Sequence, residues 1–279
     1  MRTNQDNEVA LSEQLLGWIC ELMPSWAAED IGGFRYLDGG YSNHNYRFTH
    51  RGHIYVLRAP HRQRPFVDRH LEHELLLARQ VPATPEIIAL DPASGRMISR
   101  WVQGHLLADL SPGPDQVVRY LRRLHADLPD APRIFDPLAQ ARRYLETVAA
   151  PDWIFQLASR IVWPQGRMVS CHNDLNPWNV IQEPGGRWVT LDWEWFGRND
   201  PLFDLVTLHQ SLAFDDAVLG ELAGALLQME VGRSRLQACL ATFWLREYAW
   251  AAAEIAAGDT RPEVLEQQLR GEERLRALL

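Results

Sequence analysis

The chain has 279 residues, of which 46% are hydrophobic and 23% are charged, a composition that suits one or two globular domains with a sizeable core. Its net charge of −8 at pH 7 argues against a broad basic face for nucleic acid, and no apolar window approaches the roughly 18 residues of a membrane span. The three cysteines are widely separated and the N-terminal residues have no apolar core of signal-peptide length. We therefore expect reduced thiols in a cytoplasmic protein without nucleic-acid or membrane partners.

The N-terminal part of the chain predicts a leading helix followed by short strands. Apolar side chains recur at helical spacing from Val9 to Leu22, which predicts a helix over residues 8–31. The next segments predict three strands, over residues 33–38, 45–50 and 53–58. The loop between the first two strands, residues 39–44, contains two glycines, a serine and an asparagine. Such a loop fits either an ordinary hairpin or a flap whose backbone amides cover phosphate groups.

Arg58 ends the third strand, as either a solvated surface charge or a clamp for phosphate. A guanidinium is always charged and can bind two phosphate oxygens at once. A helix is predicted from Pro65 to Val81, because proline is well placed in a first helical turn. Strands over residues 86–90 and 96–104 complete this part of the chain, and we predict a domain boundary near Gly104.

The rest of the chain predicts mostly helices. Apolar residues at core spacing predict a helix over residues 115–128 and further helices over residues 135–163. His125 falls among the apolar positions of the first of these helices, which favours a core histidine over a catalytic one. The chain after Ala213 is also predicted to be helical, with one mostly apolar face that includes Glu247.

The densest cluster of chemically active side chains lies between Ser170 and Asp204. Asp174 is followed five residues later by Asn179, and Asp192 comes after a hairpin whose turn is Glu183–Gly186. One acid, a carboxamide and a second acid in this layout are used to transfer the terminal phosphoryl group of ATP. Because the two strands of the hairpin pair, we expect Asn179 and Asp192 to converge.

Each of these residue types suits a role in phosphoryl transfer. A hydroxyl is a weak nucleophile at neutral pH, so Asp174 is predicted to act as its base. Asn179 and Asp192 offer the oxygen ligands that magnesium prefers. A buried His-Asp pair is often structural and an isolated aspartate after a strand is often a turn residue, but the combined pattern favours catalysis. A thiol nucleophile at Cys171 is disfavoured, because the neighbouring acids already account for the site.

Three motifs carry a family resemblance: residues 171–181, which open with Cys-His-Asn-Asp, Leu-Asp-Trp-Glu-Trp at residues 191–195, and residues 197–205. They resemble the choline/ethanolamine kinase and aminoglycoside phosphotransferase superfamily, and the first two look closest to its choline, ethanolamine and thiamine kinase branch. The resemblance covers nearly the whole chain. It implies an α+β, two-lobed protein-kinase-like fold, with a small antiparallel-sheet N-lobe over residues 1–103, including the leading helix, and a mainly helical C-lobe over residues 104–279.

The resemblance implies that the N-lobe binds the nucleotide. Ser42 and Asn43 would cover the phosphates of ATP. Arg58 would replace the lysine that pairs with phosphate in most kinases, a departure that resembles the choline kinase branch. A glutamate of the following helix should hold Arg58. Glu74 fits this position better than Glu72, although only the register of the helix separates the two.

The C-lobe is implied to carry the catalytic loop, the metal site and the acceptor pocket. His172 would brace the loop around Asp174, and the acid that matches Asp204 would brace the same loop. ATP and Mg²⁺ are the implied cofactors, and the implied acceptor is a small cationic alcohol such as choline, ethanolamine or thiamine. Trp193 and Glu194 flank the metal acid and could reach this acceptor. Eight of the 11 tryptophans follow residue 150, and aromatic rings can surround a cation.

Two other functions stay open at this point. An aminoglycoside or other antibiotic kinase would use the same machinery with an acid-lined acceptor pocket, and the tail offers Glu247, Glu254 and Asp259 for it. A catalytically silent binding protein of the same fold is the third possibility, although the predicted catalytic side chains are all present. Spacing alone identifies neither the acceptor nor the oligomeric state.

Overall fold

The computed structural model describes residues 4–37, 43–60, 77–163 and 166–279. They form two compact units. The first consists of Met1–Asp109 together with Trp178–Glu194, and the second of Leu110–Pro177 together with Trp195–Leu279. The chain therefore leaves the second unit at Trp178 and returns to it at Trp195.

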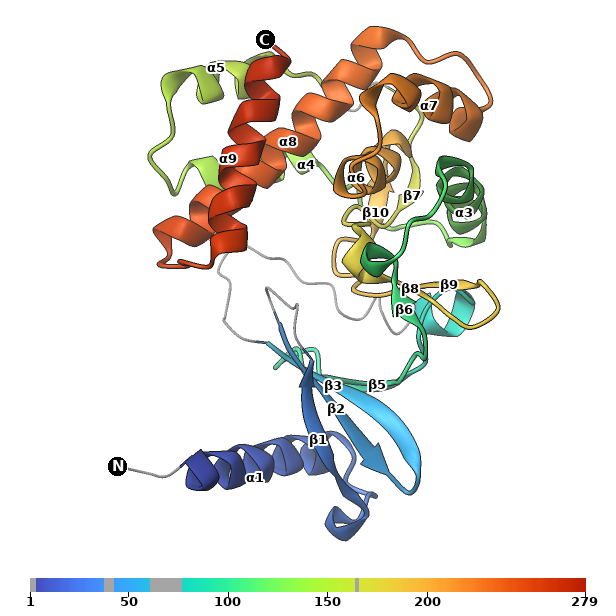
Figure 1. The fold of residues 1–279 in the computed structure, drawn as a ribbon, viewed down its shortest axis with the longest axis vertical. Helices are drawn as coiled ribbons and strands as arrows, with labels where there is room; N and C mark the ends of the chain where they lie inside the picture. Colours follow the sequence, from blue (N-terminus) through green and yellow to red (C-terminus); the bar gives the residue numbers. More distant parts are fainter. Residues whose placement is uncertain (1–3, 38–42, 61–76, 164–165) are drawn as a thin grey trace. The chain divides into compact units, whose positions relative to one another are not determined.

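The first unit is built on a five-stranded antiparallel sheet in the order β1-β2-β3-β5-β4 (Figure 1). Its strands are β1 (Ile31–Leu37), β2 (Asn43–His50), β3 (His53–Pro60), β4 (Ile87–Leu90) and β5 (Met97–Arg100). Burial alternates along β2, where Tyr46 and Phe48 are buried while Arg47 and Thr49 are only partly buried. One face of the sheet is therefore apolar and needs a cover.

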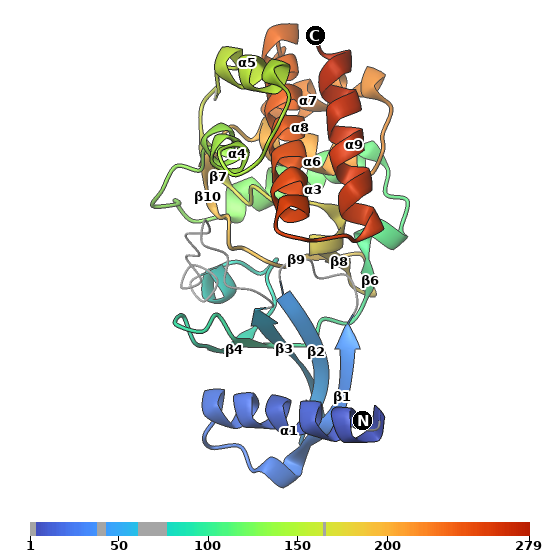
Figure 2. The same cartoon turned by 90° about the vertical axis from the view of Figure 1, so that its left-hand side faces the viewer.

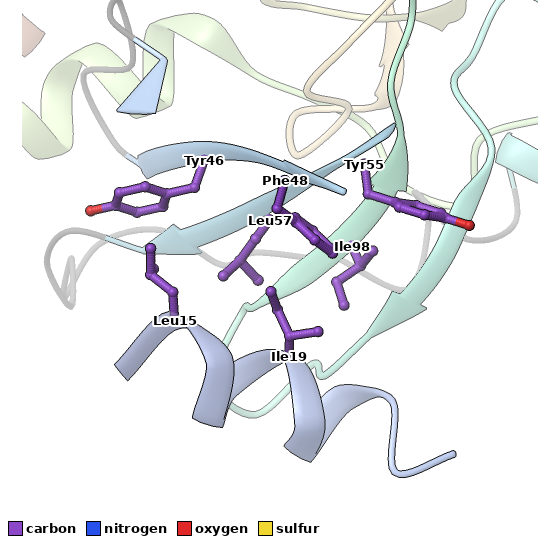
Figure 3. Close-up of a cluster of buried hydrophobic side chains, with 7 residues drawn as sticks. All are labelled: Leu15, Ile19, Tyr46, Phe48, Tyr55, Leu57 and Ile98. Carbon is purple, nitrogen blue, oxygen red and sulfur yellow. The ribbon is translucent and has the colours of Figure 1, made fainter. Parts of the chain in front are cut away.

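The helix α1 (Asn4–Leu22) supplies that cover. Leu15 and Ile19 of α1 are buried in one cluster with side chains of β2, β3 and β5 (Figure 3). The strand residues of this cluster are Tyr46, Phe48, Tyr55, Leu57 and Ile98. The helix predicted over residues 8–31 is wrong at its C-terminal end, because Pro24 disfavours helical backbone in the residue before it. A short 3₁₀ turn at Ala28–Asp30 leads into β1 instead.

A three-stranded sheet in the first unit joins two parts of the chain that are distant in sequence. β6 (His105–Leu106) pairs with β8 (Val180–Gln182), and β8 pairs with β9 (Trp188–Thr190). In the turn between β8 and β9, Gly185 and Gly186 have φ angles of 106° and 86°, which glycine adopts without strain. The hairpin predicted around Glu183–Gly186 is therefore confirmed.

Gly104 lies so close to this sheet that a side chain does not fit. A Cβ atom on Gly104 would lie 2.2 Å from the backbone oxygen of Gln182. Gly104→Ala is therefore expected to push β6 away from β8 and to lower the free energy of unfolding by about 1–3 kcal/mol, the usual cost of overpacking. Urea unfolding measures this loss.

The matched control is Gly17→Ala on α1, where a Cβ atom has no neighbour within 4 Å. Alanine there should be neutral or stabilise the helix by up to about 1 kcal/mol. Equal stability of Gly104→Ala and the wild type would contradict the close approach of the two strands.

The second unit is mainly helical. Its helices are α3 (Pro114–Asp127), α4 (Pro137–Leu145), α5 (Asp152–Arg160), α6 (Leu202–Ser211), α7 (Leu219–Leu227), α8 (Arg233–Ala256) and α9 (Pro262–Ala277). α8 and α9 lie side by side in both views, and α4 packs against α8 (Figures 1 and 2). β7 (Val169–Cys171) and β10 (Gly197–Asn199) form a small antiparallel sheet. Among the residues described, none of the helices has the length and apolarity needed to span a bilayer.

The predicted α+β fold class is confirmed, with a small antiparallel sheet in one part and mainly helices in the other. The sequence predicted a boundary between residues 103 and 104, and one segment is grouped differently in the structure. The hairpin at residues 178–194 belongs to the unit that contains the large sheet, whereas the sequence analysis grouped it with the helical lobe. Asn179 and Asp192 therefore belong to the same unit as Arg58, and the functional division into lobes remains a proposal.

Candidate active site

The loop that carries Asp174 follows β7 and is tied to β10. Asn173 has a φ angle of 70°, a left-handed conformation that asparagine tolerates better than most residues. Its side-chain amide donates to the backbone oxygens of Cys171 (3.2 Å), Trp195 (2.9 Å) and Gly197 (3.1 Å). One carboxamide therefore fastens both sides of the loop and fixes the direction in which the chain enters Asp174.

Asp204 braces the same loop from α6. One of its carboxylate oxygens accepts the backbone N–H of Asn173 (2.8 Å), and the other accepts the backbone N–H of His172 (3.0 Å) and contacts Nε2 of His125 (2.9 Å). Burial alone would raise the pKa of Asp204, but the hydrogen bond and charge of His125, with the contribution of His172, hold the pKa below its usual value. The buried acid is therefore an anion that organises the loop, as the resemblance implied.

His172 connects this brace to Asp174. Its ring is fully buried, and its Nδ1 accepts the backbone N–H of Asp174 (3.1 Å). Because Nδ1 accepts a hydrogen bond in this contact, a neutral ring carries its proton on Nε2. The contact supports the predicted role of His172 as a residue that braces the loop.

The carboxylate of Asp174 contacts Arg246, a residue that was not singled out from the sequence. Its Oδ1 accepts a hydrogen bond from Nη2 of Arg246 (3.0 Å), and the Asp174 side chain is 27% exposed. Arg246 also donates from Nη1 to Glu247 (3.1 Å) and from Nε to Gln140 of α4 (2.8 Å). The available signal was an arginine inside the apolar run of a core helix, next to Glu247, which the sequence analysis had placed on the helix face.

Burial raises the pKa of Glu247 to about 7, although Arg246 opposes the shift, while the negative charge of Asp174 adds to it. Between the ordinary pKa of 4.5 and this value, the folded protein keeps a proton that the unfolded chain has released. The free energy of unfolding should therefore fall as the pH rises through this interval. A pKa raised from 4.5 to about 7 corresponds to a fall of about 3 kcal/mol in the free energy of unfolding. This value is an upper bound, because a fifth of the Glu247 side chain is exposed and solvent screens its charge.

Glu247→Gln should remove this part of the pH dependence, because glutamine does not titrate. Urea unfolding at a series of pH values between 4.5 and 8 measures the effect. An unchanged slope in the variant would contradict the assignment of the proton to Glu247.

The hairpin of the first unit brings together the two predicted metal ligands. The backbone N–H of Leu191 donates to the backbone oxygen of Asn179 (2.8 Å), so Asn179 and Asp192 lie at the same end of the β8–β9 hairpin. Asp192 has a φ angle of 59°, which is uncommon outside glycine, asparagine and aspartate. Its carboxylate pairs with Nη1 of Arg58 on β3 (3.1 Å). A carboxamide oxygen and a carboxylate at one hairpin end fit magnesium, which is a hard, oxygen-binding cation.

Three other predicted site residues, Asn43, Trp193 and Glu194, are buried in the first unit. Trp193 is buried, and its indole N–H donates to the backbone oxygen of Thr190 (3.2 Å), which packs the ring within the first unit. Glu194 is also buried. Asn43 is buried at the start of β2. Ser42, Glu72 and Glu74 lie outside the described residues.

A second group of side chains among the described residues, made of histidine, cysteine and aspartate, also resembles a metal site. Single ligand atoms of His125, Cys171 and Asp204 lie within 4.8 Å of one another. Both oxygens of Asp204 already accept hydrogen bonds in the loop brace. Burial raises the pKa of the Cys171 thiol well above its usual range, so the thiol stays protonated and is a poor ligand or nucleophile. We interpret this group as structural.

Three comparisons relate the chain to known proteins. Residues 33–239 match the sequence model of the family described as "Phosphotransferase enzyme family". The protein LicA of Haemophilus influenzae is 28% identical over 189 residues, which are 61% of this chain and 56% of that protein. The chain thus spans little more than half the length of this relative.

Two solved structures share the fold. A choline/ethanolamine kinase family protein from Mesorhizobium loti matches with a TM-score of 0.74 and 23% identity, over 96% of this chain and 94% of that one. The choline kinase LicA from Streptococcus pneumoniae matches with a TM-score of 0.76 and 17% identity, over 96% of this chain and 99% of that one.

Proposed function

Because the chain belongs to the phosphotransferase enzyme family, we propose that it transfers the γ-phosphoryl group of ATP to the hydroxyl of a small cationic alcohol of the choline, ethanolamine or thiamine type. The observation that carries the proposal is the braced Asp174 loop. Asp204, His172 and Asn173 fix its backbone, and the carboxylate of Asp174 remains partly exposed. Such a carboxylate can accept the proton of an attacking hydroxyl.

The residues of the first unit support the nucleotide half of the reaction. Asn179 and Asp192 would hold Mg²⁺, which when bound neutralises the charge of the phosphates. Arg58 is buried on β3 and already contacts Asp192, so its guanidinium is oriented toward the proposed metal ligand. A guanidinium in this position suits the binding of phosphate oxygens. Asn43 would assist at the phosphates, together with Ser42.

The acceptor class is supported by the structural relatives, which include a choline kinase and a choline/ethanolamine kinase family protein. The charges around Asp174 agree with a cationic acceptor. Asp174 and Glu247 carry two carboxylates against one guanidinium from Arg246, so the cluster is negative when Glu247 is ionised. The three free cysteines fit the proposed cytoplasmic location.

The proposal is tested by measuring ADP release from magnesium-ATP with a panel of acceptors. The panel contains choline, ethanolamine, thiamine, homoserine, simple sugars and several aminoglycosides, with Asp174→Ala as the control. We expect turnover of one cationic alcohol, which disappears in the control and after chelation of the metal. Turnover of an aminoglycoside alone would favour an antibiotic kinase, and ATP binding without any turnover would favour a silent binding protein.

A further inference from the structure

The guanidinium of Arg246 is held by three different side chains. Nε donates to Gln140 of α4, Nη1 to Glu247 of α8 and Nη2 to Asp174 of the catalytic loop, at 2.8, 3.1 and 3.0 Å. The arginine side chain is only 8% exposed. Since each nitrogen has its own oxygen partner, the plane and position of the guanidinium are fixed before any substrate binds.

The protein maintains this arrangement at an energetic cost. A buried ion pair is often no more stabilising than apolar side chains of similar volume, so stability alone does not account for an arginine inside a core helix. Gln140 bears part of the cost. Its oxygen faces Arg246, while its Nε2 is buried without a hydrogen-bond partner among the described residues. The stability lost at Gln140 is accounted for if the placement of Arg246 matters for the carboxylate of Asp174, which it contacts.

We propose that Arg246 is a positioning residue, which fixes the Asp174 carboxylate through Oδ1 in the orientation needed to accept the acceptor's hydroxyl proton. The inference rests on the proposed function of Asp174. A cation this close to a carboxylate also weakens it as a proton acceptor. Glu247 contacts the same guanidinium and, when ionised, offsets that effect with its own negative charge. Arg246 thus supplies orientation, and Glu247 compensates its charge.

The charged and titratable groups around Arg246 come from three elements. Asp174 belongs to the catalytic loop, Glu247 to α8 and Tyr144 to α4, and all three interact electrostatically with the guanidinium. Gln267 of α9 contacts Glu247 through its uncharged amide. Asp174 and Glu247 are therefore the two carboxylates that a change at Arg246 affects directly.

The test compares the steady-state kinetics of Arg246→Gln, Arg246→Lys and Glu247→Gln with the wild type, using the acceptor identified by the panel. Arg246→Gln should lower kcat by about 10- to 100-fold, the scale of a misplaced catalytic group, with little change in the KM for magnesium-ATP. Arg246→Lys keeps the charge but loses the three-way geometry, so its kcat should fall between those of Arg246→Gln and the wild type. It also remains informative if Arg246→Gln does not fold.

The pH profile of kcat separates positioning from a merely structural role. Loss of the guanidinium in Arg246→Gln should move the acidic limb to higher pH, because Asp174 loses a cation that stabilises its charged form. Glu247 is mostly protonated in this acidic range, because its pKa is raised to about 7, so Glu247→Gln should leave the limb in place. No shift in Arg246→Gln, or an equal shift in Glu247→Gln, would overturn the proposal.

Arg235→Gln is the matched control. Arg235 lies on the same helix and pairs with buried Asp200 through two hydrogen bonds, at 2.9 and 2.8 Å. Its loss should lower the melting temperature while kcat and the pH profile stay unchanged. If Asp174→Asn is inactive while Arg246→Gln keeps wild-type kinetics, the positioning role of Arg246 is refuted but the proposed function is not. A fully active Asp174→Asn, or a wild type that turns over no acceptor, would refute the proposed function as well.

Discussion

Asp174→Asn is expected to reduce kcat by about 10²–10⁴-fold, the contribution typical of a positioned general base. Asparagine keeps the shape of the side chain, and its oxygen can still accept the hydrogen bond from Arg246. The backbone N–H of residue 174 can still donate to His172. The substitution therefore removes the charge and the proton-accepting oxygen while it leaves the loop in place.

The effect should appear in kcat with the KM for magnesium-ATP nearly unchanged, because Asp174 is proposed to act on the acceptor hydroxyl. Asp127→Asn is the control, since Asp127 is exposed at the end of α3 in the same unit. Wild-type turnover by Asp174→Asn would show that another group accepts the proton, and the assignment of the base would have to be withdrawn.

Asp204→Asn is expected to cause the largest loss of stability, about 3–5 kcal/mol. The carboxylate is fully buried and accepts hydrogen bonds at both oxygens from the backbone of the catalytic loop. Asparagine has only one acceptor oxygen, so its amide group would face a backbone N–H that then has no partner. The contact with His125 would also lose its charged acceptor.

Urea unfolding measures this loss, with Asp216→Asn as a matched control in an exposed ion pair. Asp216 pairs with Arg274 and has a half-exposed side chain, so its substitution should cost less than about 1 kcal/mol. A similar small cost for Asp204→Asn would mean that the loop does not depend on the brace.

Local sequence signals predicted the elements that depend on local physics. The Pro-Gly-Gly turn after Glu183 predicted the hairpin because few other residues adopt its positive φ angles. The helix end near Pro24 was missed, because the apolar spacing was followed beyond a proline that stops the helix. Hydrophobic periodicity therefore predicted the type of an element better than the residues at which the element ends.

Contacts between distant segments were harder to predict. Arg58 was singled out from its place at a strand end, but its partnership with Asp192, 134 positions later, depends on how the two sheets of the first unit pack. The contact between Arg246 and Asp174 spans 72 positions and depends on the rotation of α8 about its axis. Spacing along the chain determines neither the packing of the two sheets nor the rotation of α8. It could therefore predict Asp174 and Asp192 as site residues without identifying their partners.

The composition of the first unit has a consequence for the order in which the protein is made. Its small sheet needs β8 and β9, which come from residues 178–194, while the rest of the unit ends at Asp109. Domains generally fold as units while the ribosome adds residues from the N-terminus. Here β6 of the nascent first unit has no β8 to pair with until residues 110–177 of the second unit have also been translated. A fragment that ends at Asp109 would contain β6 without β8 and β9, the hairpin that completes the three-stranded sheet.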